Sequence, residues 1–84
     1  METATIKTPG HPKTNSNQRI KGIEAHHKIS QHLEQASKDH LTAAKYLEAG
    51  NEELAMQNTL KAQAHLIYAN ELQRENIKRY LLAD

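Results

Sequence analysis

The sequence predicts an all-α protein: a long antiparallel two-helix hairpin that pairs with a second copy to form a four-helix bundle. Val, Phe and Trp are absent from its 84 residues, so strand-forming residues are scarce, whereas Ala, Leu, Glu, Gln and Lys favour helix. No Pro follows Pro12, and Gly50-Asn51 separates two long amphipathic stretches. Apolar residues make up only 37% of the chain, so a core formed within one copy must be small.

Residues 1–16 are predicted to be a flexible, mildly basic tail ahead of the hairpin of residues 17–84. Pro9 and Pro12 break regular structure there, and Ile6 is an isolated apolar residue. No apolar run resembles a signal peptide or approaches the roughly 18 residues of a membrane span, so we expect a cytoplasmic protein without a membrane partner. Cysteine is absent, which excludes disulfides, thiolate nucleophiles and zinc fingers.

The first helix is expected from about residue 17 to residue 49, and Ser16 or Asn17 can cap its start. At ~100° per residue, small and apolar side chains gather on one side of it, and charged or amide side chains gather on the other. The apolar side consists of Ala25, Ile29, Leu33, Ala36, His40, Ala43, Ala44 and Leu47. A helix of this length extends for roughly 50 Å.

Gly50-Asn51 is the predicted turn, because Gly favours the left-handed conformation after a helix and Asn caps the start of the next one. Glu52 and Glu53 then suit the positive end of a second helix, which is expected over about residues 52–82. One broad arc of this helix is apolar. The arc contains Leu54, Ala55, Ala62, Leu66, Ala69, Leu72 and Ile77, interrupted by Asn58, His65 and Asn76.

The second helix also carries a separate apolar side, formed by Met56, Leu60, Ala64 and Ile67. Two helices packed as a hairpin cover one stripe each, so this side predicts an interface with another copy. The expected seam within the hairpin is Ile29, Leu33, Leu47, Leu54 and Leu66. A single core of fewer than ~70–80 residues rarely supplies more than ~3–5 kcal/mol, and the predicted hairpin has no disulfide to add to it. We therefore predict a homodimer or a higher oligomer.

Histidine is the conspicuous chemical feature, at His11, His26, His27, His32, His40 and His65. Zinc sites need three or four ligands that converge at ~2.0–2.1 Å, whereas His26 and His40 lie roughly 21 Å apart along one helix. If the chain turns at Gly50-Asn51, His40 lies one turn from the position opposite His65, so these two can approach. The metal alternative is therefore His40 with His65, joined by His26 and His32 across an oligomer.

The simpler interpretation is that these are half-buried histidines, hydrogen-bonded across the hairpin or to solvent. Imidazole becomes charged below about pH 6.5, and a charged ring resists burial on a packing face. Acid is therefore expected to weaken association of the copies.

Other classes of site lack their residues. The chain contains no G-x-S-x-G, P-loop or G-x-G-x-x-G sequence, and the Glu24 and His27 of an E-x-x-H match face away from the apolar side. A two-helix unit offers no deep pocket of ~300 Å³, so neither an enzyme nor a cofactor is predicted. The sequence pI of about 8.1 lies below the ~9 typical of nucleic-acid binders, and we expect no nucleic-acid partner.

The predicted function is a non-enzymatic structural or protein-interaction module that acts through self-association. The partner is the chain itself or another protein. Transition-metal binding by the histidines named above is the alternative.

The residues around the turn resemble known helical hairpins. The run from Tyr46 to Asn51, followed by Ala55 and Ala62, is similar to the helix junction of tetratricopeptide repeats, but no second copy follows it, so no solenoid is expected. A broader resemblance covers about residues 25–70. It rests on His26-His27, His32-Leu33-Glu34, Ala43 to Asn51 and Leu60 to His65. These runs resemble a family of small bacterial helical hairpins that are rich in His and Ala and have no assigned function, which implies a bacterial source and a hairpin but no site.

Overall fold

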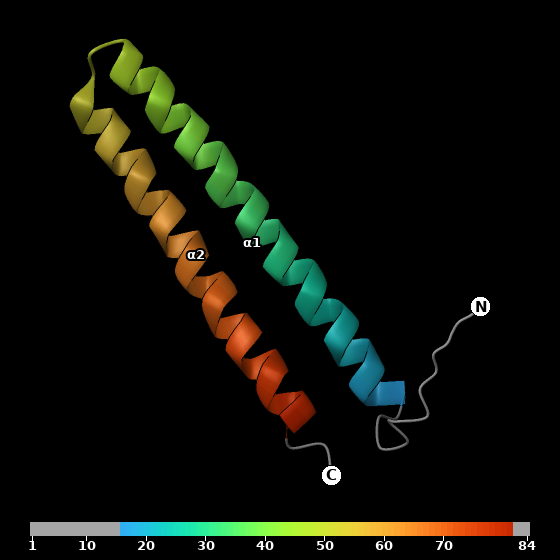
Figure 1. Cartoon of the computed structure of the whole chain (residues 1–84). Helices are drawn as coiled ribbons and strands as arrows, with labels where there is room; N and C mark the ends of the chain where they lie inside the picture. Colours follow the sequence, from blue (N-terminus) through green and yellow to red (C-terminus); the bar gives the residue numbers. More distant parts are fainter. Residues whose placement is uncertain (1–15, 82–84) are drawn as a thin grey trace.

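Two long helices make up the described part of the chain, which is residues 16–81 of this computed structural model. Helix α1 spans Ser16–Glu48 and helix α2 spans Glu52–Leu81, and they run side by side in opposite directions (Figure 1). No strand occurs within residues 16–81, so the predicted all-α hairpin is confirmed. Both ends of α1 lie one residue before the expected range of 17–49. The predicted tail up to residue 15 lies outside the described residues, as does residue 82.

The turn forms because Gly50 takes a backbone conformation that L-residues rarely adopt, with a φ of 80°. Its N–H donates to the Leu47 carbonyl at 2.9 Å, and the N–H of Asn51 donates to the Tyr46 carbonyl at 2.8 Å. This pair of hydrogen bonds is the Schellman ending of a helix. Asn51 then caps α2, since its Oδ1 accepts a hydrogen bond from the Leu54 N–H at 3.0 Å. The chain therefore reverses over a very short link.

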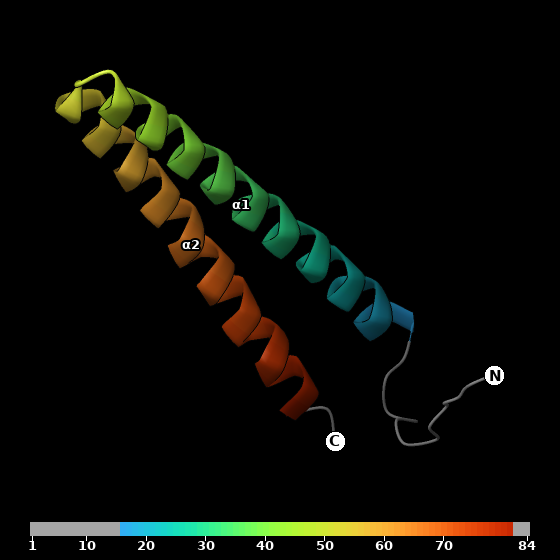
Figure 2. The same cartoon turned by 45° about the horizontal axis from the view of Figure 1, so that its top comes forward.

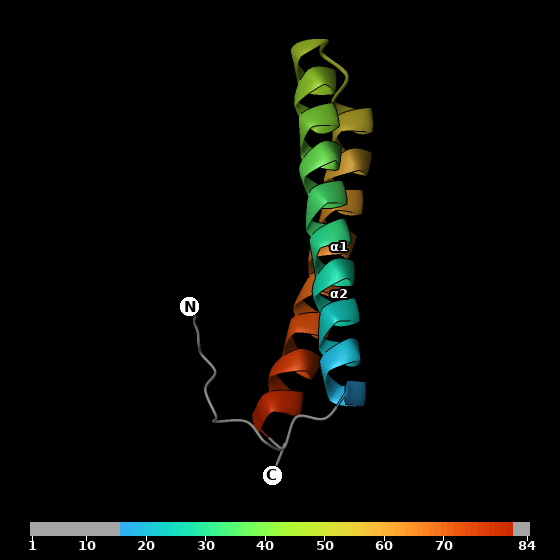
Figure 3. The same ribbon diagram turned by 90° about the vertical axis from the view of Figure 1, so that its right-hand side faces the viewer.

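The two helices meet along a seam whose residues recur in alternating steps of three and four. In α1 the seam consists of Gln18, Gly22, Ala25, Ile29, His32, Ala36, Asp39, Ala43 and Tyr46, and in α2 of Ala55, Asn58, Ala62, His65, Ala69, Leu72, Asn76 and Arg79, all buried or half-buried. Such steps average ~3.5 residues, the repeat of a coiled coil, and keep one stripe of each helix against the other. The helices stay side by side when the view is tilted (Figure 2), and they cross at a shallow angle (Figure 3).

Alanine dominates the buried part of this seam. Ala62 and Ala69 are completely buried, and Ala36 and Ala55 are 3% exposed. Because these side chains end at Cβ, the two helix axes can lie close together. Counting outward from the turn sets each alanine against a larger seam residue: Ala55 against Tyr46, Ala62 against Asp39, Ala69 against His32 and Ala36 against His65. Each larger side chain therefore fills the space that an alanine leaves.

The expected seam is wrong on the α1 side. Leu33 and Leu47, which the periodicity places in the seam, are 42% and 57% exposed. The stripe one position earlier replaces them, so that His32 and Tyr46 lie in the seam. The polar character of α2 explains this choice, because the half-buried His65 needs a polar partner across the seam and leucine offers none.

The rest of the expected seam agrees with the structure. Ile29 is buried, and Leu54 and Leu66 are half-buried. Most of the apolar arc of α2 therefore faces α1 as predicted, but Ile77 is 54% exposed, and the apolar side of α1 is turned partly outward.

Replacing Gly50 by Ala is expected to destabilise the hairpin by about 1 kcal/mol, because alanine resists the positive φ. A Cβ at this position meets nothing within 4 Å, so the loss comes from the backbone alone. Gly22→Ala is the matched control. Gly22 lies inside α1, and its added Cβ would lie 4.0 Å from Tyr80 Oη, so this change should stabilise the protein by about 0.5–1 kcal/mol. Urea unfolding at one protein concentration measures both, and effects of the same sign would contradict the assigned turn.

Ala62→Leu is expected to push the helices apart, because the larger side chain has no space opposite Asp39 and overpacking costs about 1–3 kcal/mol. The neighbouring Lys61 is exposed, so Lys61→Leu serves as the control and should change stability little. Thermal unfolding is a sensitive readout, since 1 kcal/mol corresponds to about 4–8 °C in a chain of this size. A Tm that Ala62→Leu leaves unchanged would show that the seam is not closely packed.

Candidate functional site

The densest polar contact lies near the middle of the seam, between His32 of α1 and His65 of α2. Their Nδ1 atoms are 2.8 Å apart, a hydrogen-bonding distance, and the ring centroids are 5.1 Å apart. His32 also stacks on Tyr68, with centroids 5.4 Å apart and ring planes inclined by 29°. Three rings from the two helices therefore meet where the alanines bring the helices together.

Asp39 lies beside this pair and is 8% exposed. One carboxylate oxygen, Oδ1, accepts a hydrogen bond from Gln35 Nε2 at 3.2 Å. The other, Oδ2, is buried without a hydrogen-bond partner among the described residues and lies 4.0 Å from His65 Nε2. Burying a carboxylate oxygen without a partner is unfavourable, so an N–H on His65 Nε2 would stabilise it.

These distances constrain where the protons lie. A hydrogen bond between two Nδ1 atoms needs one proton between them, so one ring donates and the other accepts. If the His65 Nδ1 accepts, the proton of that ring lies on Nε2 and points toward Asp39, whereas the reverse arrangement of the neutral pair sets two acceptors against each other. The position of Asp39 Oδ2, 4.0 Å from His65 Nε2, therefore favours the tautomers in which His32 donates at Nδ1.

The contact needs one Nδ1 without a proton, because two protonated Nδ1 atoms would both be donors. The site therefore holds α1 against α2 through one hydrogen bond between two imidazole rings.

A second polar contact lies nearer the open end of the hairpin, around Asn76, which is 5% exposed. Its Nδ2 lies 3.3 Å from His26 Nε2, and its Oδ1 accepts a hydrogen bond from Arg79 Nη1 at 2.8 Å. Both ends of the buried amide are thus paired. The contact ties α1 to α2 in the same way as the histidine pair does.

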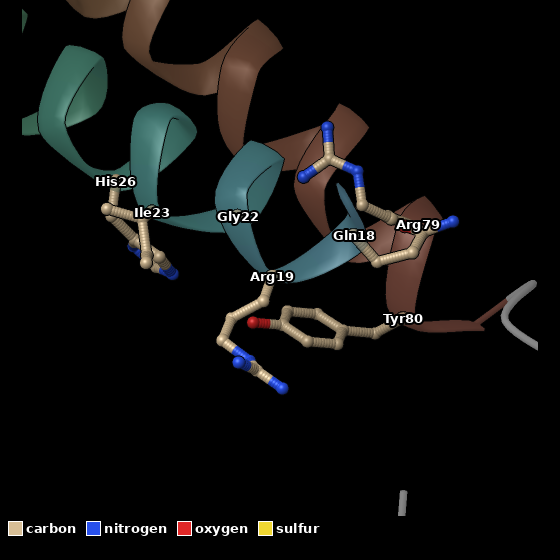
Figure 4. A pocket seen from close by; sticks show the side chains of 7 residues that line it. All are labelled: Gln18, Arg19, Gly22, Ile23, His26, Arg79 and Tyr80. Carbon is tan, nitrogen blue, oxygen red and sulfur yellow. The ribbon is translucent and has the colours of Figure 1, made fainter. Parts of the chain in front are cut away.

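A small cleft of about 180 Å³ opens beside this second contact. Its lining consists of Gln18, Arg19, Gly22, Ile23, His26, Arg79 and Tyr80. Figure 4 shows Tyr80 reaching from α2 toward α1 with Arg19 alongside its ring, whereas the Arg79 side chain points away from Tyr80. This volume is below the ~300 Å³ at which ligand pockets usually begin.

The four histidines of the metal alternative are only partly brought together. His32 and His65 meet in the seam, His26 contacts Asn76, and His40 is exposed. Within residues 16–81 of one chain, no group of three or more His, Asp or Glu side chains is placed to hold a metal ion. A metal site from these histidines would need side chains of a second chain, so it stays a prediction.

The four residues of the predicted interface are all exposed. Met56 is 58% exposed, Leu60 is 61% exposed and Ile67 is 47% exposed, and Ala64 is exposed as well. Leu60 and Ile67 lie seven residues apart on the side of α2 opposite the seam, with Met56 to one side of this line and Ala64 to the other. Leu60 and Ile67 therefore lie on the back of α2 while Met56 and Ala64 lie on its two flanks, so the four do not form one stripe.

Asp39 belongs to the histidine site without having been predicted in it. The signal that could have found it is the seven-residue step, which leads from His32 to Asp39 and on to Tyr46. In α2, three steps of seven residues lead from Ala55 through Ala62 to Asn76.

Comparison of the chain with models of protein families, with curated proteins and with solved structures finds no match to it. The small bacterial hairpin family suggested by the residues thus stays a prediction. Within residues 16–81, neither helix is apolar over a stretch long enough to cross a bilayer.

Proposed function

We propose that this chain is a non-enzymatic structural or protein-interaction module that acts through self-association. The observation that carries the proposal is the division of its apolar side chains. Within residues 16–81 the buried apolar residues are six alanines and Ile29, and no large side chain there is fully buried. Twelve large apolar side chains between Ile20 and Leu81 are exposed instead.

This division makes a lone hairpin weakly stabilised. Burying a whole Leu, Ile or Met side chain contributes about 1.5–3 kcal/mol, and alanine offers only one methyl group. Chains with so small a core rely on disulfides, metals or association, and the described residues hold no cysteine and no cluster of metal ligands. Association covers the exposed side chains and supplies the missing apolar burial.

A second copy of the chain is the simplest partner. Two antiparallel hairpins that share a face form a four-helix bundle, and two-fold dimers are the commonest closed assembly. The polar contacts of the seam support this role, because they fix how α1 lies against α2 and so present the exposed side chains on a defined surface.

The molar mass in solution tests the proposal. Light scattering at micromolar concentration should give at least twice the 9.5 kDa of one chain, and Tm should rise with protein concentration because association stabilises only the folded copies. A cooperatively melting species of 9.5 kDa with a Tm independent of concentration would overturn it.

A further inference from the structure

The hairpin has two flanks beside the seam, and they differ in chemistry. On one side Ile23 and Tyr80 line the same cleft as His26, and Ile77 lines a second cleft with His26, so residues of both helices share this flank (Figure 4). Seven-residue steps extend the flank from His26 to Leu33 along α1.

We call this side the apolar flank and define it by two stripes. The α1 stripe is Arg19, Ile23, His26, Ser30, Leu33, Ser37, His40, Ala44 and Leu47, and the α2 stripe is Glu52, Met56, Thr59, Gln63, Leu66, Asn70, Gln73, Ile77 and Tyr80. Arg19 and Glu52, each near the start of its helix, are the only Asp, Glu, Lys or Arg residues in these stripes. Between these two ends of the hairpin, the flank contains no Asp, Glu, Lys or Arg side chain.

The opposite flank is charged. Its groove of about 740 Å³ is lined by Lys28, Gln31, His32, Tyr68, Glu71, Leu72, Arg74, Glu75 and Lys78. Charges of both signs alternate there, which is typical of a surface that stays in water. Depletion of charge with retention of large apolar side chains marks the centre of a protein interface, and only the apolar flank shows it.

We propose that the apolar flank docks against the apolar flank of a second copy of this chain. The inference rests on the proposed function and identifies the surface that performs it. At ~1.5 Å per residue, about 30 residues of each helix give a flank roughly 45 Å long, and two helices about 10 Å wide each make it about 900 Å². A stable interface of standard size needs about 800 Å² from each partner, so this flank is large enough.

The α1 stripe also has a shape that suits such docking. Ser30, Ser37 and Ala44 alternate with the larger Leu33, His40 and Leu47. The same alternation of small and large side chains closes the seam within the hairpin, where alanines face larger residues. A two-fold axis reverses the second copy, so its large side chains can face the small residues of the first copy, as in the seam.

Paired substitutions test which surface docks. Leu33→Lys/Ile77→Lys places one charge on each helix of the apolar flank, and both residues are exposed in the hairpin, at 42% and 54%. Gln31→Lys/Gln57→Lys is the matched control at exposed positions of the same helices outside the two stripes. The dissociation constant of the dimer should rise at least 100-fold in the first variant, because charge would be buried at the interface, and change less than threefold in the control.

A third variant, Leu60→Lys/Ile67→Lys, charges the back of α2. Loss of the dimer in this variant, with Leu33→Lys/Ile77→Lys still dimeric, would overturn the inference while the proposed function stands. A wild-type chain that is monomeric at all accessible concentrations would overturn both. Sedimentation equilibrium measures each constant.

Cross-linking gives a readout that does not depend on how the charged variants fold. The chain has no cysteine, so a single Ser37→Cys labels the middle of the apolar flank and Thr42→Cys labels the opposite side of the same helix. A long-arm bismaleimide should join two copies through Cys at position 37 and not through Cys at position 42. Efficient joining at position 42 alone would place the interface on the charged flank.

Discussion

The close approach of α1 and α2 is the constraint on which the rest of the structure depends. Ala36, Ala55, Ala62 and Ala69 leave almost no volume between the helices, so each layer that contains one of them has room for only one larger side chain. In most two-helix contacts the seam is filled by leucine and isoleucine, which both hold the helices apart and supply the burial. Here the burial per layer is small, and the large apolar side chains lie on the flanks instead.

The larger members of the seam are mostly polar, and this gives the hairpin a defined register. His65 faces His32 and approaches Asp39, and Asn76 meets both His26 and Arg79. Sliding one helix by a turn would separate these partners and leave their polar atoms buried and unpaired. Polar seam residues thus add little to stability but specify one arrangement, a role that buried polar groups also have in coiled coils.

The sequence could predict the hairpin but not the rotation of α1. Gly50 and Asn51 carry local signals whose physics acts within a few residues, and the turn has the hydrogen bonds those signals imply. The stripes through His32 and through Leu33 share the same central residues and the same spacing, so periodicity alone cannot choose between them. Hydrophobicity alone favours the stripe through Leu33. Polar side chains on α2, thirty or more positions away in the chain, instead determine which stripe of α1 packs against α2. The pairing of His32 with His65 depends on this contact between distant parts of the chain, so the local sequence pattern could not predict it.

The short link at Gly50 has a consequence for how copies can exchange parts. Steps of seven from Ala43 lead to Gly50 and Gln57, not to Ala55, so the alanine stripes of the two helices are out of phase along the chain. If residues 49–51 became helical, α1 and α2 would form one continuous helix, and its two alanine stripes would face different directions. Two such helices could not pack against each other along their whole length. The offset thus disfavours dimers that exchange a helix, so α1 of each copy stays packed against α2 of the same copy.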